Sequence, residues 1–292
     1  HEGHLDNHLR ICVEEGLDPV TAIRMATLNA AECFDLKDRG AIAPGYRGDV
    51  VLLDDLKDFH VNRVFVEGVL VAEEGKYLPE IKKCDISSVK GSVIVKDFSK
   101  EKFKMNLKST KVNVIKILPG GVVTAKDTAE IELDANGEFV RNPEVDLVKV
   151  AVVERHQGTG NVACGFLKGY GIKEGAVALS VAHDSHNIIV VGVNDDEMEF
   201  AVNSLVEQEG GIVLVKEGKV IESMPMPIAG LMSDQSGEWV DQKLTDIHEK
   251  AYEELGICGD VEPVMTLCFM SLAVIPEIKL TDMGLFDVTT FS

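Results

Sequence analysis

Five consecutive polar residues in the middle of the chain combine two histidines with an aspartate, a serine and an asparagine. The run is His183-Asp184-Ser185-His186-Asn187, and it lies between two strongly apolar segments, 176–182 and 188–193. Segments this apolar are expected to be buried strands, so the polar groups must lie in a loop or form costly hydrogen bonds inside the core. Imidazole and carboxylate groups in one loop can ligate a metal, transfer protons or bind a polar ligand. The alternative is a hairpin turn whose Asp184 and Ser185 bond only to nearby backbone.

A second polar stretch follows the apolar segment 147–154. It reads Arg155-His156-Gln157-Gly158-Thr159-Gly160-Asn161. Polar side chains beside flexible glycines at the end of a strand commonly bind ligands. The glycines do not form a phosphate-binding fingerprint, because no glycine stands at position 163. A ligand-binding loop and a simple turn both remain open interpretations.

Three histidines near the start of the sequence, His1, His4 and His8, form a further candidate. His4 and His8 are one helical turn apart and could share a metal ion. Leu5 stands where a metalloprotease motif would carry glutamate, so this spacing indicates no such enzyme. Solvent-exposed histidines are the simpler interpretation, and we predict no metal-ligating residue in this chain.

The charge balance bears on the partners that the chain can have. Lys and Arg number 29 against 49 Asp and Glu, which gives a net charge of −20. Such an acidic chain is not expected to bind nucleic acid or an anionic membrane. No apolar run approaches the roughly 20 residues of a membrane helix. The six cysteines show no CxxC spacing and are expected to be free thiols, so we predict a cytoplasmic location.

The elements that would position these residues change along the chain. Helical periodicity predicts helices at 5–13 and 18–33, with Asp18 as the N-cap and Pro19 in the first turn. Strands at 61–66 and 69–71 are predicted to form a hairpin around Glu67-Gly68. Residues 72–110 are charged and weakly patterned, which indicates a linker or domain boundary.

Strands and helices alternate in the rest of the chain. Helices are predicted after the Asn194-Asp195 cap and over 240–255, and strands at 112–118, 130–134, 147–154, 176–182, 188–193, 212–216 and 219–223. The strand–helix–strand unit 188–216 predicts a mixed sheet in an α+β or α/β domain.

Several longer stretches resemble the adenine deaminases of the amidohydrolase superfamily, in particular the C-terminal portion of those enzymes. Three stretches are similar to motifs found across the superfamily: Glu2-Gly3-His4-Leu5, residues 27–31 and residues 40–51. Stretches that resemble the adenine deaminases more specifically are 156–161, 180–187, 225–233 and 276–287. The resemblance covers essentially the whole chain.

The resemblance implies a fold and a domain organisation. Residues 1–36 would be the final helices of a (β/α)8 metal-dependent hydrolase barrel. Residues 37–106 would form part of a small β domain and a linker, and residues 107–292 an α+β C-terminal domain. The expected fold class is therefore α/β and α+β.

The resemblance also implies a reaction, the purine-salvage conversion of adenine and water to hypoxanthine and ammonia. A hydroxide activated by manganese or iron would attack C6 of the base. The sequence contains no HxH pair, so the primary metal ligands are not in this chain, which is expected to be inactive alone. Catalytic roles are predicted for His183, Asp184 and His186, and substrate-binding roles for His156, Gln157, Asn161, Ser185 and Asn187.

Two other readings remain. The expected partners are adenine, as the substrate, and a second copy of the chain in a homo-oligomer. In the alternative interpretation, the C-terminal domain is a structural or oligomerisation domain with no role in the active site. An unrelated α/β protein that binds a small molecule would require every motif match to be coincidental.

Overall fold

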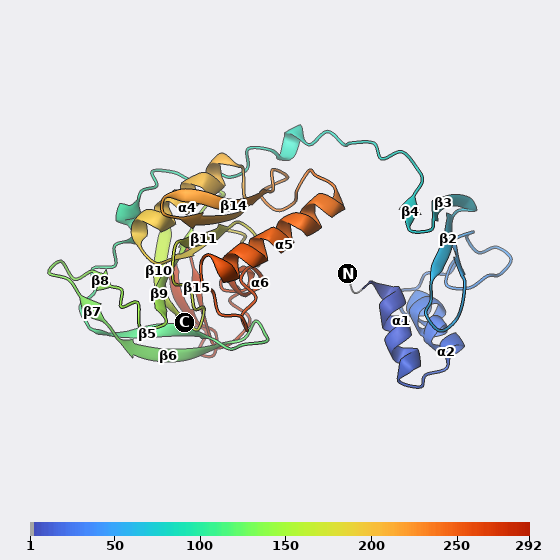
Figure 1. The fold of residues 1–292 in the computed structure, drawn as a ribbon, viewed down its shortest axis with the longest axis horizontal. Coiled ribbons are helices and arrows are strands. Elements are labelled where there is room, and N and C mark those ends of the chain that lie inside the picture. The colour runs from blue at the N-terminus through green and yellow to red at the C-terminus, as the bar shows by residue number, and fades with distance from the viewer. Residues whose placement is uncertain (1–2) are drawn as a thin grey trace. The chain divides into compact units, whose positions relative to one another are not determined.

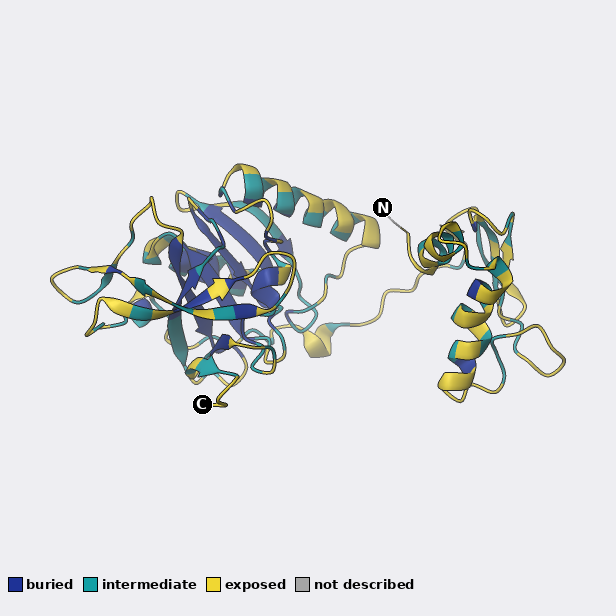
Figure 2. Ribbon diagram, turned by 90° about the horizontal axis from the view of Figure 1, so that it is seen from below, coloured by how far each residue is buried: buried dark blue, intermediate teal, exposed yellow. Residues whose placement is uncertain are grey.

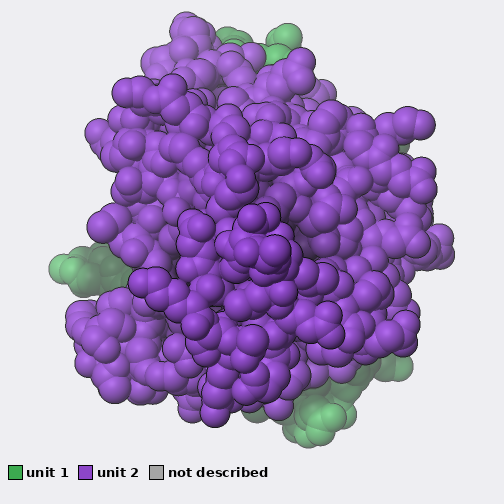
Figure 3. All heavy atoms as spheres, turned by 90° about the vertical axis from the view of Figure 1, so that its left-hand side faces the viewer, with its two compact units in different colours: residues 1–84 green, residues 85–292 purple. Residues whose placement is uncertain are grey.

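The computed structural model describes residues 3–292 and divides the chain into two compact units, residues 1–84 and 85–292 (Figures 1 and 3). His1 and Glu2, which belong to the predicted histidine cluster and the first superfamily motif, lie outside the described residues. Residues 85–106, which the sequence assigns to the linker, pack within unit 2. Phe103 is fully buried there, and the Ile94 amide donates a hydrogen bond to the Arg155 carbonyl at 2.8 Å.

Unit 1 contains a helical part and a small antiparallel sheet. Its elements are α1 (Leu5–Glu14), α2 (Pro19–Arg24), a π-helical turn (Met25–Asn29), α3 (Ala30–Cys33), β1 (Val50–Leu53), β2 (Val61–Val66), β3 (Val69–Glu73) and β4 (Lys76–Tyr77). The Asp18 side chain caps α2 by accepting a hydrogen bond from the Thr21 amide at 2.9 Å, as predicted. Glu67 and Gly68 both have positive φ, which suits the tight turn of the predicted hairpin between β2 and β3.

Unit 2 is built on an eight-stranded sheet in the order β14-β13-β11-β12-β9-β10-β5-β6. Its strands are β5 (Lys111–Ile117), β6 (Thr124–Glu130), β9 (Leu147–Val153), β10 (Val162–Lys168), β11 (Ala176–Leu179), β12 (Ile188–Gly192), β13 (Gly211–Lys216) and β14 (Lys219–Pro225). Neighbouring strands are antiparallel except β5 and β10, which are parallel. The predicted mixed sheet is therefore confirmed.

Helices cover both faces of this sheet. They are α4 (Asp195–Glu207), α5 (Gly237–Glu253) and the short α6 (Met265–Cys268). Successive residues of a strand point to opposite faces, and β9 serves a core on each side. Val150 packs in the cluster that contains Ile247 of α5, whereas Ala151 packs with Leu205 of α4. Figure 2 shows the resulting arrangement, with buried strands inside and exposed outer faces on the helices.

Several predicted strands differ from the structure. The strand expected at 130–134 is wrong, because β6 ends at Glu130 and a separate two-residue strand, β7 (Glu132–Leu133), pairs with β8 (Phe139–Val140). β6 lies at the edge of the sheet and alternates polar with small residues, so it has no apolar run. The elements that were not predicted include β10, whose apolar pattern is interrupted by Cys164 and Gly165, and the hairpin of β15 (Ile278–Thr281) with β16 (Gly284–Asp287).

Candidate functional site

The two polar stretches leave the large sheet at the same edge. Residues 180–187 connect β11 to β12, and residues 154–161 connect β9 to β10. β12 and β9 are antiparallel neighbours with Ile188 opposite Val153, so the start of one strand lies beside the end of the other. Strand register therefore brings together two loops that are about 20 residues apart in the sequence. We call residues 154–161 and 180–187 the polar edge.

Hydrogen bonds join the two loops directly. The His156 ring nitrogen Nε2 lies 2.7 Å from the Ser185 carbonyl oxygen. The Arg155 amide donates to the side-chain oxygen of Asn187 at 3.3 Å, and the Arg155 Nε donates to the His186 carbonyl at 2.5 Å. The side chain of Asn187 is thus buried and engaged by the neighbouring loop, rather than open to a ligand.

Arg155 is the structural centre of the polar edge. Its side chain is only 1% exposed, and both terminal guanidinium nitrogens donate to the Ala229 carbonyl at 3.2 Å. A Cβ atom on Gly230 would lie 2.8 Å from Arg155 Nη1, so the chain can approach the guanidinium this closely only as glycine. No carboxylate of residues 3–292 forms an ion pair with this guanidinium, and burial lowers the pKa of Arg155. It therefore holds three segments together through backbone carbonyls alone.

His183 and His186 lie side by side in the second loop. Their ring centroids are 5.1 Å apart, and the His183 ring also lies 4.8 Å from the ring of Phe269. The His183 amide donates to the Cys268 carbonyl at 2.7 Å, which ties the loop to the end of α6. His186 Nδ1 is buried without a hydrogen-bond partner in the described part of the chain. Burial, with the charges of His183 and Arg155, lowers the pKa of His186, so its imidazole is neutral at neutral pH.

The remaining predicted residues differ in exposure. Asp184, Ser185 and Gln157 are exposed to solvent. Asn161 is half-buried, and its side-chain amide lies 3.4 Å from an Asp282 carboxylate oxygen in the β15–β16 turn. The structure thus brings all eight predicted site residues to one edge, although the side chains of Asn187, Asn161 and His156 already have protein partners.

Glu154 organises the first loop and was missed by the sequence analysis. Its carboxylate accepts hydrogen bonds from the amides of His156, Gln157 and Thr159 and from the Thr159 hydroxyl. Burial alone would raise the pKa of Glu154, but these hydrogen bonds outweigh it and lower the pKa to about 2. The sequence did contain a signal for this role, because Glu154 is an acidic residue between a buried strand and a loop that contains glycines.

Metal-ligating groups do not gather in the described residues. Across positions 3–292, no three His, Cys, Asp or Glu side chains are arranged to hold an ion. His4 and His8 are both exposed at the start of α1. No helix in the same range is long and apolar enough to cross a membrane.

Comparisons with known proteins agree with the motifs. The sequence profile of the adenine deaminase C-terminal domain matches residues 121–292, and that of the amidohydrolase family matches residues 3–71. Adenine deaminase 2 of Desulfotalea psychrophila is 68% identical over 289 residues, which cover 99% of this chain and 50% of that protein. Adenine deaminase of Ligilactobacillus salivarius is 50% identical over 287 residues, covering 98% and 50% of the two chains.

These matches define the class of protein to which the chain belongs. The fold is a mixed α/β structure with an amidohydrolase segment followed by an adenine deaminase C-terminal domain. The chain belongs to the adenine deaminase family and corresponds to its C-terminal portion. It spans about half the length of the curated relatives it matches.

Proposed function

We propose that this chain is the C-terminal portion of a cytoplasmic adenine aminohydrolase that converts adenine and water to hypoxanthine and ammonia in purine salvage. Two facts support the proposal. Relatives named adenine deaminase match almost the whole chain, and two stretches with adenine deaminase motifs meet at one edge of the large sheet. The second fact is the structural observation that carries it. Separate motifs that are joined in space can serve one site.

The proposed domain organisation follows the same comparison. Residues 1–36 would complete a (β/α)8 barrel, residues 37–106 would supply part of a small β domain and a linker, and residues 107–292 the C-terminal domain. The described residues do not fit a manganese or iron site, because no ligand cluster occurs in positions 3–292. The ligands of such a metal would lie in the half of the relatives that this chain does not span.

The contribution of this chain would be proton transfer and enclosure of the base. Removal of an amino group requires a proton at the departing nitrogen. His186, neutral and with an unpaired Nδ1, can accept a proton and return it. His183 lies in ring contact with it, and Asp184 is the exposed carboxylate of the same loop. His156, Gln157, Asn161, Ser185 and Asn187 would line the approach to these groups.

A structural or oligomerisation role is the second candidate function. It is favoured by the hydrogen bonds that the polar edge makes within itself, since Asn187 and His156 both contact the opposite loop. In that case the polar edge would consist of two hairpin loops that stabilise each other by hydrogen bonds. The chain would then serve to assemble copies of the enzyme.

Substitution in the full-length protein separates the two functions. We expect His183→Ala and His186→Ala each to lower kcat/KM at least tenfold, because a positioned acid–base group contributes roughly 10²–10⁴-fold. The melting temperature and metal content should stay unchanged. His60→Ala, at an exposed histidine of unit 1, is the matched control and should keep wild-type kinetics. Wild-type kinetics in both well-folded polar-edge variants would refute the catalytic role.

A further inference from the structure

Arg155 binds two successive residues in the second loop of the polar edge. Its Nε donates to the His186 carbonyl at 2.5 Å, and its backbone amide donates to the Asn187 side-chain oxygen at 3.3 Å. His186 has a φ of 52°, a left-handed conformation that is uncommon for residues other than glycine. The His186 amide donates to the Ala182 carbonyl at 2.6 Å. Hydrogen bonds at both of its own backbone groups therefore hold His186 in this conformation.

The Arg155 guanidinium is itself fixed by a turn in the segment that follows β14. Both terminal nitrogens donate to the Ala229 carbonyl at 3.2 Å, and the Ala229 amide donates to the Val89 carbonyl at 2.9 Å. The next carbonyl, of Gly230, accepts a hydrogen bond from the Ser180 hydroxyl at 2.6 Å. Ser180 is fully buried and directly follows β11. The large sheet thus fixes the position of the guanidinium.

Arg155 also carries a permanent charge into the polar edge. Its side chain is 1% exposed and forms no ion pair with a carboxylate of the described chain, residues 3–292. A guanidinium stays protonated at neutral pH even where burial lowers its pKa, as it does for Arg155. Because water is largely excluded, the charge is weakly screened. The His186 ring, on the residue that Arg155 binds, is subject to this charge at every pH near neutrality.

The charged and titratable groups that act on the His186 ring come from both loops of the polar edge. They are His183, Asp184, Arg155 and His156. Asp184 alone favours the protonated imidazole, and it is exposed to water, which screens it. The end of α6 adds no charge, because burial raises the pKa of the Cys268 thiol to about 12. Burial is the main cause that lowers the pKa of His186, followed by the charges of His183 and Arg155, of which only that of Arg155 is permanent.

We propose that Arg155 is the positioning residue of His186, and that it acts by holding the backbone of His186 and by placing a permanent positive charge near its ring. The inference rests on the proposed function, in which His186 accepts a proton and returns it. A proton acceptor must be unprotonated when the substrate binds and must meet it in one orientation. Arg155 supports both conditions without touching the substrate, since its own side chain is buried.

Two substitutions separate the charge from the hydrogen bonds. Arg155→Gln removes the charge, whereas Arg155→Lys keeps it but loses the forked geometry that reaches two carbonyls. Arg141→Gln is the matched control, because Arg141 is also half-buried or more and its Nη2 donates to the Ile172 carbonyl at 3.1 Å. The control therefore loses the same charge and the same kind of hydrogen bond.

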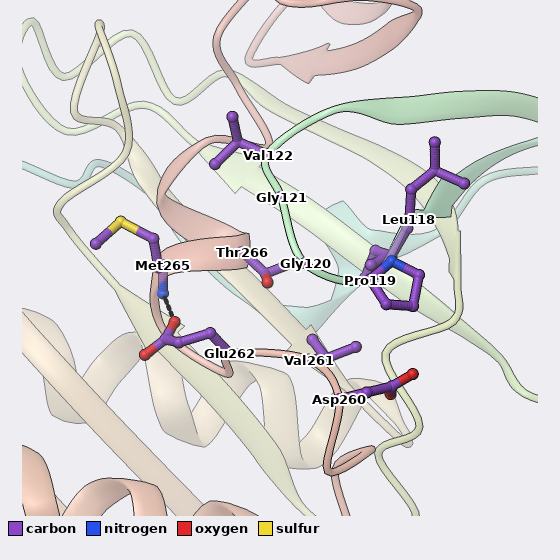
Figure 4. A pocket seen from close by; sticks show the side chains of 11 residues that line it. Leu118, Pro119, Gly120, Gly121, Val122, Asp260, Val261, Glu262, Met265 and Thr266 are labelled. Carbon is purple, nitrogen blue, oxygen red and sulfur yellow. Dashed lines mark hydrogen bonds between the residues drawn. The ribbon is translucent and has the colours of Figure 1, made fainter. Parts of the chain in front are cut away.

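The control residue is remote from the polar edge. Arg141 precedes β9, whereas the polar edge begins where β9 ends. The turn after β5 lies at the same end of the large sheet as Arg141, because β5 runs parallel to β10. A cavity of about 260 Å³ opens there between residues 117–122 and 260–266, and none of its lining residues belongs to the polar edge (Figure 4).

NMR titration of the histidine rings, on this chain and without turnover, gives the first readout. The ring signals of His186 are assigned by their absence from His186→Gln. We expect Arg155→Gln to move the titration midpoint of His186 to higher pH, because a positive charge is lost. The midpoint should stay close to wild type in Arg155→Lys and Arg141→Gln.

The wild-type chain provides a measurement that does not depend on the folding of a variant. Because the interaction between two charges is mutual, the Arg155 Nε–H signal should move with the midpoint of His186. An unchanged His186 midpoint in folded Arg155→Gln would overturn the inference. An Arg155 signal that does not respond to the titration of His186 would overturn it as well.

Kinetics of the full-length protein give the second readout. We expect kcat to fall at least roughly tenfold in Arg155→Gln and Arg155→Lys, with KM within about threefold of wild type. The acid limb of kcat/KM, which reports the free enzyme, should move to higher pH in Arg155→Gln and stay in place in Arg155→Lys. A merely structural role would lower activity in proportion to the unfolded protein and leave the acid limb of Arg155→Gln unmoved.

The two readouts distinguish failure of this inference from failure of the proposed function. An unmoved ring midpoint in Arg155→Gln refutes the role of Arg155 and leaves the role of His186 intact. A ring midpoint that moves while the acid limb stays in place shows that His186 is not the proton acceptor. That result refutes the proposed function and this inference with it.

Discussion

Lys279 gives the sharpest test of the electrostatics of the fold. It lies on β15 with no exposed surface, and its ammonium donates to the Val122 carbonyl at 3.0 Å. No carboxylate within residues 3–292 pairs with it. Burial lowers the pKa of Lys279 from 10.5 to about 8, because the charged form loses its hydration.

The magnitude follows from the pKa difference between the folded and unfolded chain. A shift of this size corresponds to a free-energy penalty of about 3 kcal/mol at neutral pH, at roughly 1.4 kcal/mol per pKa unit. The unfolded chain binds the proton more tightly, so this penalty is fully present below pH 8 and disappears as the pH rises towards 10.5. Lys279→Met removes the penalty and loses one hydrogen bond worth about 1 kcal/mol. We therefore expect a net gain of about 2 kcal/mol at pH 7.

Denaturant unfolding of the chain measures this gain through the fluorescence of Trp239. It is the single tryptophan of the sequence, and it packs on the core of unit 2. The advantage of Lys279→Met over wild type should shrink as the pH rises from 8 to 10.5. Lys126→Met, at an exposed lysine paired with Asp287, is the control and should show no such trend. An advantage that is constant with pH, or a less stable variant at pH 7, would refute the reasoning.

Three further predictions concern the loop of Glu154, the unit boundary and activity. Glu154→Gln should destabilise the chain by up to about 3 kcal/mol at pH 7, and the difference should narrow as the pH falls from 4.5 towards 2, because the folded pKa of Glu154 is lowered. Unfolding of both proteins across that range checks it, and a difference that does not change with pH would contradict it. Limited proteolysis should cut first between the end of β4 and the start of unit 2, at 78–85, which narrows the range 72–110 that the sequence indicates. Early cleavage inside 176–216 would show that the boundary is misplaced. The chain alone, with added manganese, should release no ammonia from adenine, and metal-dependent turnover would contradict the proposal that the metal ligands lie elsewhere.

Much of the fold could be predicted from apolar periodicity. The buried strands β9, β12 and β13 and the helices α4 and α5 stand within a few residues of their predicted positions. Their sequences are uniformly apolar or strongly amphipathic, so burial dictates the local pattern. β6 could not be found in this way, because an edge strand with one solvated face needs no apolar run. β10 escaped because glycine and cysteine are weak strand signals.

The residues of the candidate site could be predicted from the sequence, but the contact between its two loops could not. Residue types singled out His183, His186 and His156, yet nothing in their spacing says that the two loops touch. That contact depends on β12 pairing with β9, which is a long-range property of the sheet. The anchoring role of Arg155 could not be predicted either, since its partners are backbone carbonyls and carry no side-chain signature.

The two loops of the polar edge differ in what their conformations depend on. The Glu154 carboxylate holds residues 154–161 by hydrogen bonds to amides of the same loop, so the conformation of this loop is stabilised from within. Residues 180–187 take one anchor from Arg155, which belongs to the other loop, and another from the Cys268 carbonyl at the end of α6. The second loop therefore depends on partners outside itself. Loss of the Glu154 hydrogen bonds should loosen the first loop and weaken one anchor of the second, whereas a side-chain change confined to the exposed tip at Asp184 and Ser185 should leave the conformation of the first loop intact.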